Sequence, residues 1–397
     1  MSIQESLGQP AAERELEFPS SRYDDLVAAY RWQIPEHFNI GVDVCDRWAE
    51  WDPNRTALID IGTGDSEREI SFGALRNYSN RIANVLVEAG IRAGDRVAIL
   101  LPQRWETAAA HIALYKLGVI AVPLSALFGP DALAMRLSDA GCTAVITNIA
   151  LANTVARLRN RLPGLNLCFT LDGKGAGSVD LDRACMSASV QLEPVATKAD
   201  DPAMIIYTSG TTGPPKGTVH AHRVLLGHLP GMEMAFDLFP QPGDRMWSPA
   251  DWSWIGGLLV VLLPALHHGI PVVARRGDPL TGAALFEILA RYRIRNALLP
   301  PAALRLMRTV AAPEKRWTLS LRSVTAGGES LTPDLFHWAK RALGLTVNES
   351  YGQSECNLTI AGCDALGTAQ AGWMGRQTPG HRVAILNDKG DVLAPGK

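Results

Sequence analysis

A short stretch, Tyr207–Gly217, carries the residue types that bind phosphate groups. Its glycines let backbone N–H groups turn towards one point, and successive N–H groups arranged in this way bind anions. Lys216 adds a mobile positive charge to the small residues Thr208, Ser209, Gly210, Thr211, Thr212 and Gly213. The pattern differs from Walker A, because proline precedes the lysine and glycine follows it. It suits a polyphosphate, with a glycine- and threonine-rich surface loop as the ordinary alternative.

This stretch resembles the phosphate loop of the adenylate-forming enzymes, which include acyl-CoA synthetases, luciferases and the adenylation domains of peptide synthetases. Three further stretches resemble motifs of that family, in the same order along the chain. They are Ala250–Gly257 for its acid pocket, Ala326–Ser330 for its adenine pocket, and Tyr351–Glu355 for its nucleotide and magnesium motif. A surface loop would not account for four ordered motifs, and the resemblance extends from about residue 25 to the last residue.

Two details make the chain most similar to the short- and medium-chain acyl-CoA synthetases. Trp254 follows Asp251 by three residues, as in the Ala-Asp-x-x-Trp string of those enzymes. Domains that activate amino acids typically open the same motif with Phe-Asp. The segment Tyr30–Asn39 also resembles the medium-chain group.

The resemblance implies a reaction in two steps that uses ATP, Mg²⁺ and coenzyme A. The carboxylate of an acid, expected to be medium-chain, branched or aryl, attacks the α-phosphate of ATP and yields an acyl adenylate and pyrophosphate. The sulfur of coenzyme A then displaces AMP. Because two anions meet in the first step, catalysis depends mainly on charge neutralisation and alignment. The alternatives are transfer of the acyl group to a carrier protein, and a chain that binds nucleotides with little turnover.

The resemblance also assigns roles to residues of the four motifs. The catalytic residues would be Thr208, Lys216 and Glu355, with Glu355 holding Mg²⁺ directly or through water. The nucleotide would lie against the phosphate stretch and against Gly327, Gly328, Glu329, Ser330, Asn348, Glu349, Ser350, Tyr351, Gly352, Gln353 and Ser354, the last of which replaces the family's usual threonine. The acyl group would lie against Trp254, Gly256 and Gly257. The ordinary alternatives are a solvated Lys216, a surface Glu355 and a core Trp254.

Composition narrows the class of protein. Of 397 residues, 47% are hydrophobic and 20% are charged, which is typical of a globular chain too long for one core. The formal charge is −2 and no basic block occurs, so nothing indicates nucleic-acid binding. The longest apolar run, Ile255–Leu266, is shorter than the roughly 20 residues needed to span a membrane, and we expect a buried helix there. The partners are small molecules, with a homodimer as one expected assembly.

The N-terminal segment carries Glu5, Glu13, Glu15 and Glu17 and has no apolar core, so it resembles neither a secretory signal nor a transit peptide. The six cysteines are scattered without a CxxC pair, which is typical of reduced thiols in a large chain. Both observations favour a cytoplasmic protein.

Hydrophobic periodicity predicts an α/β fold. A helix is expected from residue 72, with Ser71 as its N-cap and Gly90 at its end, and further helices around 105–117 and 130–140. Strands are expected at 96–101, 119–122 and 144–147, so the elements alternate as in a mostly parallel sheet with helices on its faces. A connection (172–200) leads to a second alternating unit. It has strands at 203–207, 271–274, 297–300 and 323–326, a helix at 219–229, and a hairpin around Asn387–Gly390.

These elements suggest four segments: a polar arm (1–24), a first α/β subdomain (25–195), a second one with the phosphate stretch (196–345), and a β-rich part with the nucleotide motif (346–397). The expected fold is two mostly parallel sheets flanked by helices, plus the start of a small β-barrel-like subdomain. The family continues with a ribose-binding Asp, a hinge and a mobile domain that supplies a lysine. No stretch of this chain matches those parts, so we expect it to be a large N-terminal domain with impaired turnover.

Overall fold

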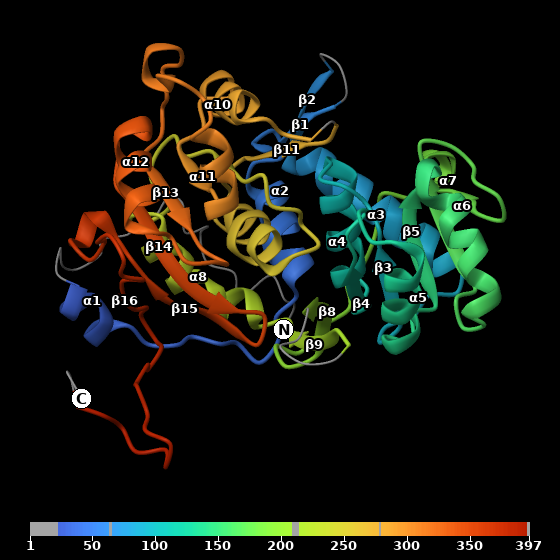
Figure 1. The fold of residues 1–397 in the computed structure, drawn as a ribbon. Helices are drawn as coiled ribbons and strands as arrows, with labels where there is room; N and C mark the ends of the chain where they lie inside the picture. Colours follow the sequence, from blue (N-terminus) through green and yellow to red (C-terminus); the bar gives the residue numbers. More distant parts are fainter. Residues whose placement is uncertain (1–22, 63–65, 209–213, 278, 395–397) are drawn as a thin grey trace.

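The computed structural model describes residues 23–62, 66–208, 214–277 and 279–394. Two β-sheets with helices on their faces form two lobes that lie side by side (Figure 1). The prediction of two mostly parallel sheets flanked by helices is confirmed. In the described part of the chain, no helix is both long and apolar enough to cross a membrane.

The first lobe contains the seven-stranded sheet. Its order is β7 (Val179–Asp180), β6 (Leu167–Leu171), β5 (Ala144–Asn148), β3 (Arg96–Ile99), β4 (Ile120–Pro123), β8 (Pro202–Thr208) and β9 (Lys216–Ala221). All neighbouring strands are parallel except β8 and β9, which form an antiparallel hairpin. The helices of this lobe are α3 (Phe72–Glu88), α4 (Trp105–Lys116), α5 (Pro130–Asp139), α6 (Ile149–Leu158), η3 (Arg159–Arg161) and α7 (Leu181–Ser187).

The second lobe contains the nine-stranded sheet. Its order is β16 (Arg376–Gln377), β15 (Cys356–Ala361), β14 (Val347–Gln353), β13 (Ser323–Ala326), β12 (Asn296–Leu298), β10 (Met246–Trp247), β11 (Val272–Arg275), β1 (Thr56–Ile61) and β2 (Glu67–Ser71). The central strands from β14 to β1 are parallel, and antiparallel strands lie at both edges.

The other helices are α1 (Tyr23–Ala29), η2 (Val42–Asp46), α2 (Arg47–Trp51), α8 (Val224–Ala235), η4 (Gly256–Leu262), α9 (Leu263–His267), α10 (Gly282–Arg291), α11 (Pro301–Met307), η5 (Pro313–Lys315), α12 (Pro333–Leu343) and η6 (Asp364–Leu366). The apolar run that we expected to form a buried helix is helical and almost wholly buried, as η4 and α9.

Local sequence explains where helix α3 begins and ends. Ser71 accepts a hydrogen bond from the backbone N–H of Ala74, as an N-cap does, and Gly90 follows the helix with φ +96°.

Helix α4 is buried on all sides, because residues 106–116 are all buried and the helix has no exposed polar face. The Nζ atom of Lys116 is kept there by Asp46 at 2.5 Å and by Asn80 at 2.8 Å.

Three expected elements are corrected. The helix expected at 219–229 is wrong at its start, because residues 216–221 form strand β9 and helix α8 begins only at Val224. Pairing with β8, which lies earlier in the chain, decides this conformation. The expected connection at 172–200 contains strand β7 and helix α7. The expected hairpin at the tail is reduced to a turn closed by one isolated bridge, Leu386 with Val392, and Figure 1 shows this tail extending away from the second lobe.

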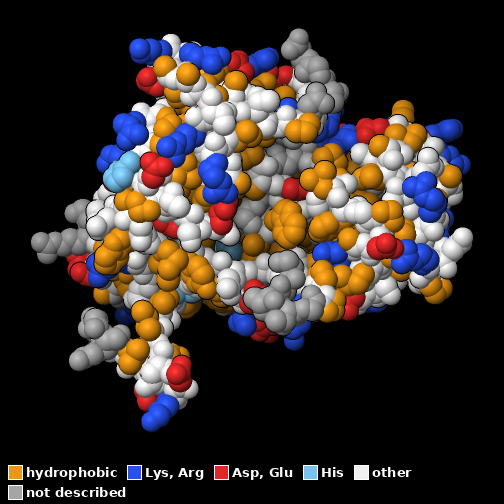
Figure 2. All heavy atoms as spheres, viewed as in Figure 1, with side chains coloured by type: hydrophobic (Ala, Val, Ile, Leu, Met, Phe, Trp, Pro, Cys, Tyr) orange, Lys and Arg blue, Asp and Glu red, His pale blue; other side chains and the backbone are white. Residues whose placement is uncertain are grey.

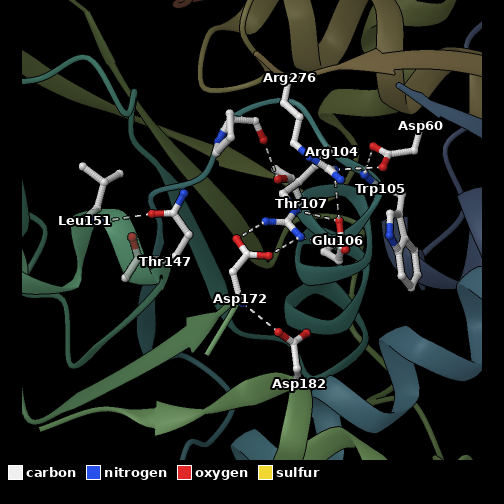
Figure 3. Close-up of polar contacts among 12 residues, drawn as sticks. Asp60, Arg104, Trp105, Glu106, Thr107, Thr147, Leu151, Asp172, Asp182 and Arg276 are labelled. Atoms are coloured by element: carbon white, nitrogen blue, oxygen red, sulfur yellow. Dashed lines mark hydrogen bonds and ion pairs between the residues drawn. The ribbon is translucent and has the colours of Figure 1, made fainter. Parts of the chain in front are cut away.

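A network of charges, of which Arg104, Glu106 and Asp60 are buried, joins the two lobes (Figure 3). Arg104 donates from Nε to Glu106 on helix α4 and from Nη1 to Asp172 beyond strand β6, both at 2.7 Å. Arg276, just after strand β11, donates to Asp60 on strand β1 at 2.8 Å and lies 4.0 Å from Glu106. Hydrogen bonds from Arg104 lower the pKa of Asp172, whereas burial raises that of Asp60. Since Asp172 belongs to one sheet region and Asp60 to the other, the network links them through α4.

Candidate functional site

A cavity of about 600 Å³ lies where the carboxyl ends of strands β10, β12, β13 and β14 meet. In open α/β sheets this edge is where ligands bind. The cavity is lined by Leu127, His228, Pro249, Ala250, Asp251, Trp254, Ile255, Gly256, Gly257, Val260, Leu298, Pro300, Gly327, Gly328, Glu329, Ser350, Gly352, Gln353, Asn357 and Leu358. The face in Figure 2 is hollowed near its centre, where hydrophobic side chains gather. Three of the four predicted motifs therefore contribute to one cavity.

The described ends of the phosphate stretch lie on the two strands of the β8–β9 hairpin. Thr208 ends strand β8, Lys216 begins strand β9, and the two residues are paired across the hairpin. A Cβ on Gly217 would lie 2.7 Å from Ile205 Cγ2, so the strands approach closely there. Five of the predicted phosphate ligands, Ser209, Gly210, Thr211, Thr212 and Gly213, lie outside the described residues.

The expected adenine turn follows strand β13. Gly327 packs against Ser350, whose carbonyl oxygen would be 2.9 Å from a Cβ, and Gly328 has φ +88°, which favours glycine. Glu329 lines the cavity, and its two carboxylate oxygens accept from Arg305 Nη2 at 2.8 Å. Ser330 is exposed and is not among the lining residues.

Asn348 and Glu349 are held in the core of strand β14. The Asn348 amide donates to the Ala235 carbonyl at 3.0 Å and accepts from the Asp364 N–H at 2.9 Å. Glu349 accepts from the Leu331 N–H at 3.0 Å. Neither side chain lines the cavity, so this arrangement does not favour the expected contact of either residue with the nucleotide.

The nucleotide and magnesium motif forms the end of β14 and the turn into β15. Gly352 and Gln353 line the cavity, Tyr351 is 38% exposed beside them, and Ser354 is half-buried in the turn. Glu355 is exposed and takes part in none of the ion pairs among the described residues. No three His, Cys, Asp or Glu side chains of that part of the chain form a metal-binding group. A single free carboxylate fits Mg²⁺ that is held mainly by phosphate oxygens and water.

The expected acid pocket lies at the same cavity. Trp254 lines it, is 41% exposed, and meets Phe128 edge-on with ring centroids 6.0 Å apart. The two glycines differ. A Cβ on Gly256 would meet only Leu298 Cδ2, at 3.5 Å, whereas one on Gly257 would collide with the carbonyl oxygens of residues 250 and 251. Gly256 thus leaves room in the cavity, and Gly257 permits the backbone turn.

Sequence reasoning assigned no role to Asp251, although the motif contains it. Its carboxylate accepts from the Ser253 N–H at 2.9 Å and from Ser125 Oγ at 3.2 Å, and burial raises its pKa. It also lines a second cavity of about 410 Å³ that shares Leu127 and Pro249 with the first. Asp251 therefore lies in the wall between the two spaces.

Two other lining residues, His228 on α8 and Asn357 on β15, were missed entirely. His228 is a single histidine in an apolar helix, and Asn357 lies two residues beyond the last predicted motif, so neither carries a spacing signal. Only the packing of α8 against β15 brings them to the cavity.

Comparisons with known proteins agree with this geometry. A family model described as AMP-binding enzyme matches residues 45–397. Human acyl-coenzyme A synthetase ACSM3, mitochondrial, is 27% identical over 385 residues, which cover 95% of this chain and 65% of the relative. Acetyl-coenzyme A synthetase 2 of Kluyveromyces lactis is 30% identical over 364 residues, covering 86% and 51%.

The structural comparisons point the same way. A crystal structure of Brucella canis acyl-CoA synthetase superimposes with a TM-score of 0.86 at 31% identity, covering 95% of this chain and 70% of that one. The anthranilate CoA ligase AuaEII, at 23% identity and a TM-score of 0.84, shares the fold. The chain spans about 65% of the length of the ACSM3 relative.

Proposed function

Because the chain belongs to the AMP-binding enzyme family, we propose that it takes part in the ATP-dependent activation of a carboxylic acid to an acyl adenylate and then to a CoA thioester. One observation carries the proposal. The acid-pocket stretch and the two nucleotide stretches, which are far apart in the sequence, line a single cavity. A carboxylate and an α-phosphate bound in it would be neighbours, so binding would supply the alignment that the reaction needs.

In the first step, a carboxylate oxygen of the acid bonds to the α-phosphorus, and the bond from that phosphorus to the bridging oxygen of pyrophosphate breaks. The β8–β9 hairpin would hold the departing pyrophosphate, with Lys216 at its base as the positive charge. Mg²⁺, when bound, would neutralise phosphate charge, and Glu355 is the residue that would hold it. Both roles are implied by the resemblance to the family, and the exposed position of the Glu355 carboxylate supports its role.

The apolar wall of the cavity would hold the rest of the acid. Ile255, Val260 and Leu298 line it together with Trp254, and Gly256 leaves space beside Leu298. A cavity of about 600 Å³ has room for a medium-chain, branched or aryl acid as well as part of a nucleotide. In the second step, a thiolate attacks the acyl carbon and AMP leaves. Coenzyme A as the thiol and a cytoplasmic location remain predictions from the sequence.

Thermal unfolding of the 397-residue chain with acyl-sulfamoyl adenosines tests the proposal, because these analogues imitate the acyl adenylate. The panel contains acetyl, butyryl, octanoyl, benzoyl and aminoacyl forms, with adenosine alone as the control. A ligand present at a hundred times its Kd adds about 2.7 kcal/mol to the free energy of unfolding. We expect one acyl class to stabilise the protein well beyond adenosine. If no acyl form exceeds adenosine, the proposal is wrong.

A further inference from the structure

His228 is a buried polar side chain of the cavity wall that has no hydrogen-bond partner in the described part of the chain. It is 2% exposed, it lines the cavity, and neither ring nitrogen has a hydrogen-bond partner in the structure. His268 also lacks hydrogen bonds at both ring nitrogens, but its Nε2 lies 3.1 Å from Glu233, and two other buried histidines each have one polar neighbour. Nδ1 of His111 lies 2.9 Å from Tyr115 Oη, and His222 accepts from the Ile40 N–H. A buried polar group without a partner costs stability, so it needs a separate explanation.

The close packing of helix α8 on strand β15 places His228 in the cavity wall. Helix α8 approaches strand β15 through Gly227 and Gly231, whose neighbours on that strand are Asn357 and Leu358. A Cβ on Gly227 would lie 3.1 Å from the Asn357 side-chain carbon, and one on Gly231 would lie 2.8 Å from Leu358 Cβ. These contacts fix the position of helix α8 against strand β15, and with it the backbone position of His228.

Burial lowers the pKa of His228 to about 3, so its ring is neutral near pH 7. A neutral imidazole offers one N–H donor and one acceptor nitrogen. Asn357 lines the cavity beside it, and its amide takes part in none of the hydrogen bonds among the described residues. The surrounding wall is apolar, with Val260, Leu298 and Leu358. A complementary ligand therefore has an apolar body and one uncharged polar group.

Building on the proposed function, we propose that the acid activated at this site carries a hydroxyl or aromatic amino substituent, which His228 recognises by a hydrogen bond. His228 is then a specificity-determining residue. An unsubstituted acid would leave its ring unpaired after water has been expelled, whereas the substituted acid would pair with it. Sites built to hydrogen-bond a substrate group discriminate strongly against analogues that lack the group.

Matched pairs of acyl-sulfamoyl adenosines test this inference by calorimetric titration of the 397-residue chain. Benzoyl is compared with the hydroxybenzoyl and aminobenzoyl isomers, and hexanoyl with hydroxyhexanoyl forms. We expect at least one substituted form to bind about 10- to 100-fold more tightly than its parent. In His228→Leu this preference should disappear while the parent keeps its affinity. His228→Asn should restore part of the preference, and His222→Asn, a buried control outside the cavity lining, should leave it unchanged.

The outcomes separate the inference from the function on which it rests. If parent forms bind but no substituted form binds more tightly to the wild-type chain, the inference is wrong and the proposed function stands. A preference that survives in His228→Leu also overturns it. If no acyl form binds better than adenosine, both fail. The wild-type comparison needs no variant, so poor folding of His228→Leu would not prevent the test.

Discussion

Gly257 packs directly against the backbone carbonyl of Asp251, so the turn that carries the acid-pocket motif has no space for a side chain at this position. A Cβ there would also lie 2.8 Å from the carbonyl oxygen of Ala250. Gly256, next to it in the sequence, faces the cavity, with Leu298 Cδ2 3.5 Å from the equivalent point. Adjacent glycines thus serve different purposes, one in folding and one in binding.

Gly257→Ala should lower the free energy of unfolding by about 1–3 kcal/mol, because backbone atoms must move to admit the methyl group. Gly256→Ala should change stability by less than about 1 kcal/mol and should weaken the binding of bulky acyl-sulfamoyl adenosines more than that of the acetyl form. Urea unfolding and calorimetric titration measure the two effects. Equal losses of stability in both variants would contradict this division.

Glu355→Gln should weaken the binding of Mg·ATP by about 10-fold, because an amide is a poorer ligand for a hard cation than a carboxylate. The binding of an acyl-sulfamoyl adenosine, which needs no metal, should not change. Glu314→Gln is the control, since it removes an exposed carboxylate that does not line the cavity. Titration with and without EDTA measures the metal-dependent part. An equal loss for both ligands in Glu355→Gln would rule out the metal role.

Arg104→Gln should lower the free energy of unfolding by about 3–5 kcal/mol, because it leaves the Glu106 carboxylate buried without its main partner. The side chains of this pair are 6% and 9% exposed. Arg161→Gln is the control, because its partner Asp131 is 92% exposed and such surface pairs contribute about 0–1 kcal/mol. Chemical denaturation of both variants provides the comparison. Similar losses would show that the buried network adds no more than a surface pair.

Stability should fall as the pH is lowered from 6.5 towards 4. Burial lowers the pKa of His111 from 6.5 to about 3, so in this window the unfolded chain binds a proton that the folded chain does not. Each such histidine contributes a slope of about 1.4 kcal/mol per pH unit. His111→Gln should therefore flatten the dependence, whereas the exposed His337→Gln should not. Urea midpoints at several pH values test this, and parallel curves for wild type and His111→Gln would refute it.

Local patterns predicted much of the fold correctly. The cap at Ser71, the stop at Gly90 and the apolar strands of both sheets depend on neighbouring residues, which the sequence displays directly. Strand β9 was missed because its conformation depends on pairing with β8 across the phosphate stretch.

The residues of the candidate site were harder to predict from the sequence than the fold was. Its motifs could be located by resemblance, but the cavity forms only where the ends of four strands meet. His228 and Asn357 reach it through the close contact of α8 with β15. That contact depends on Gly227 and Gly231 of helix α8. No residue pattern in strand β15 indicates that the two elements pack together. Such side chains can be recognised only when the packing is known.

The β8–β9 hairpin belongs to the seven-stranded sheet, whereas most of the cavity wall belongs to the nine-stranded sheet. On the proposed function, a phosphate held by the hairpin and an acid held in the cavity would belong to different lobes, so the distance between them would depend on how the two lobes are joined. A small rotation of one lobe relative to the other would then separate the reacting atoms without altering any residue that touches them. Substitutions at that joint, remote from either ligand, could then slow the chemistry while leaving both affinities intact.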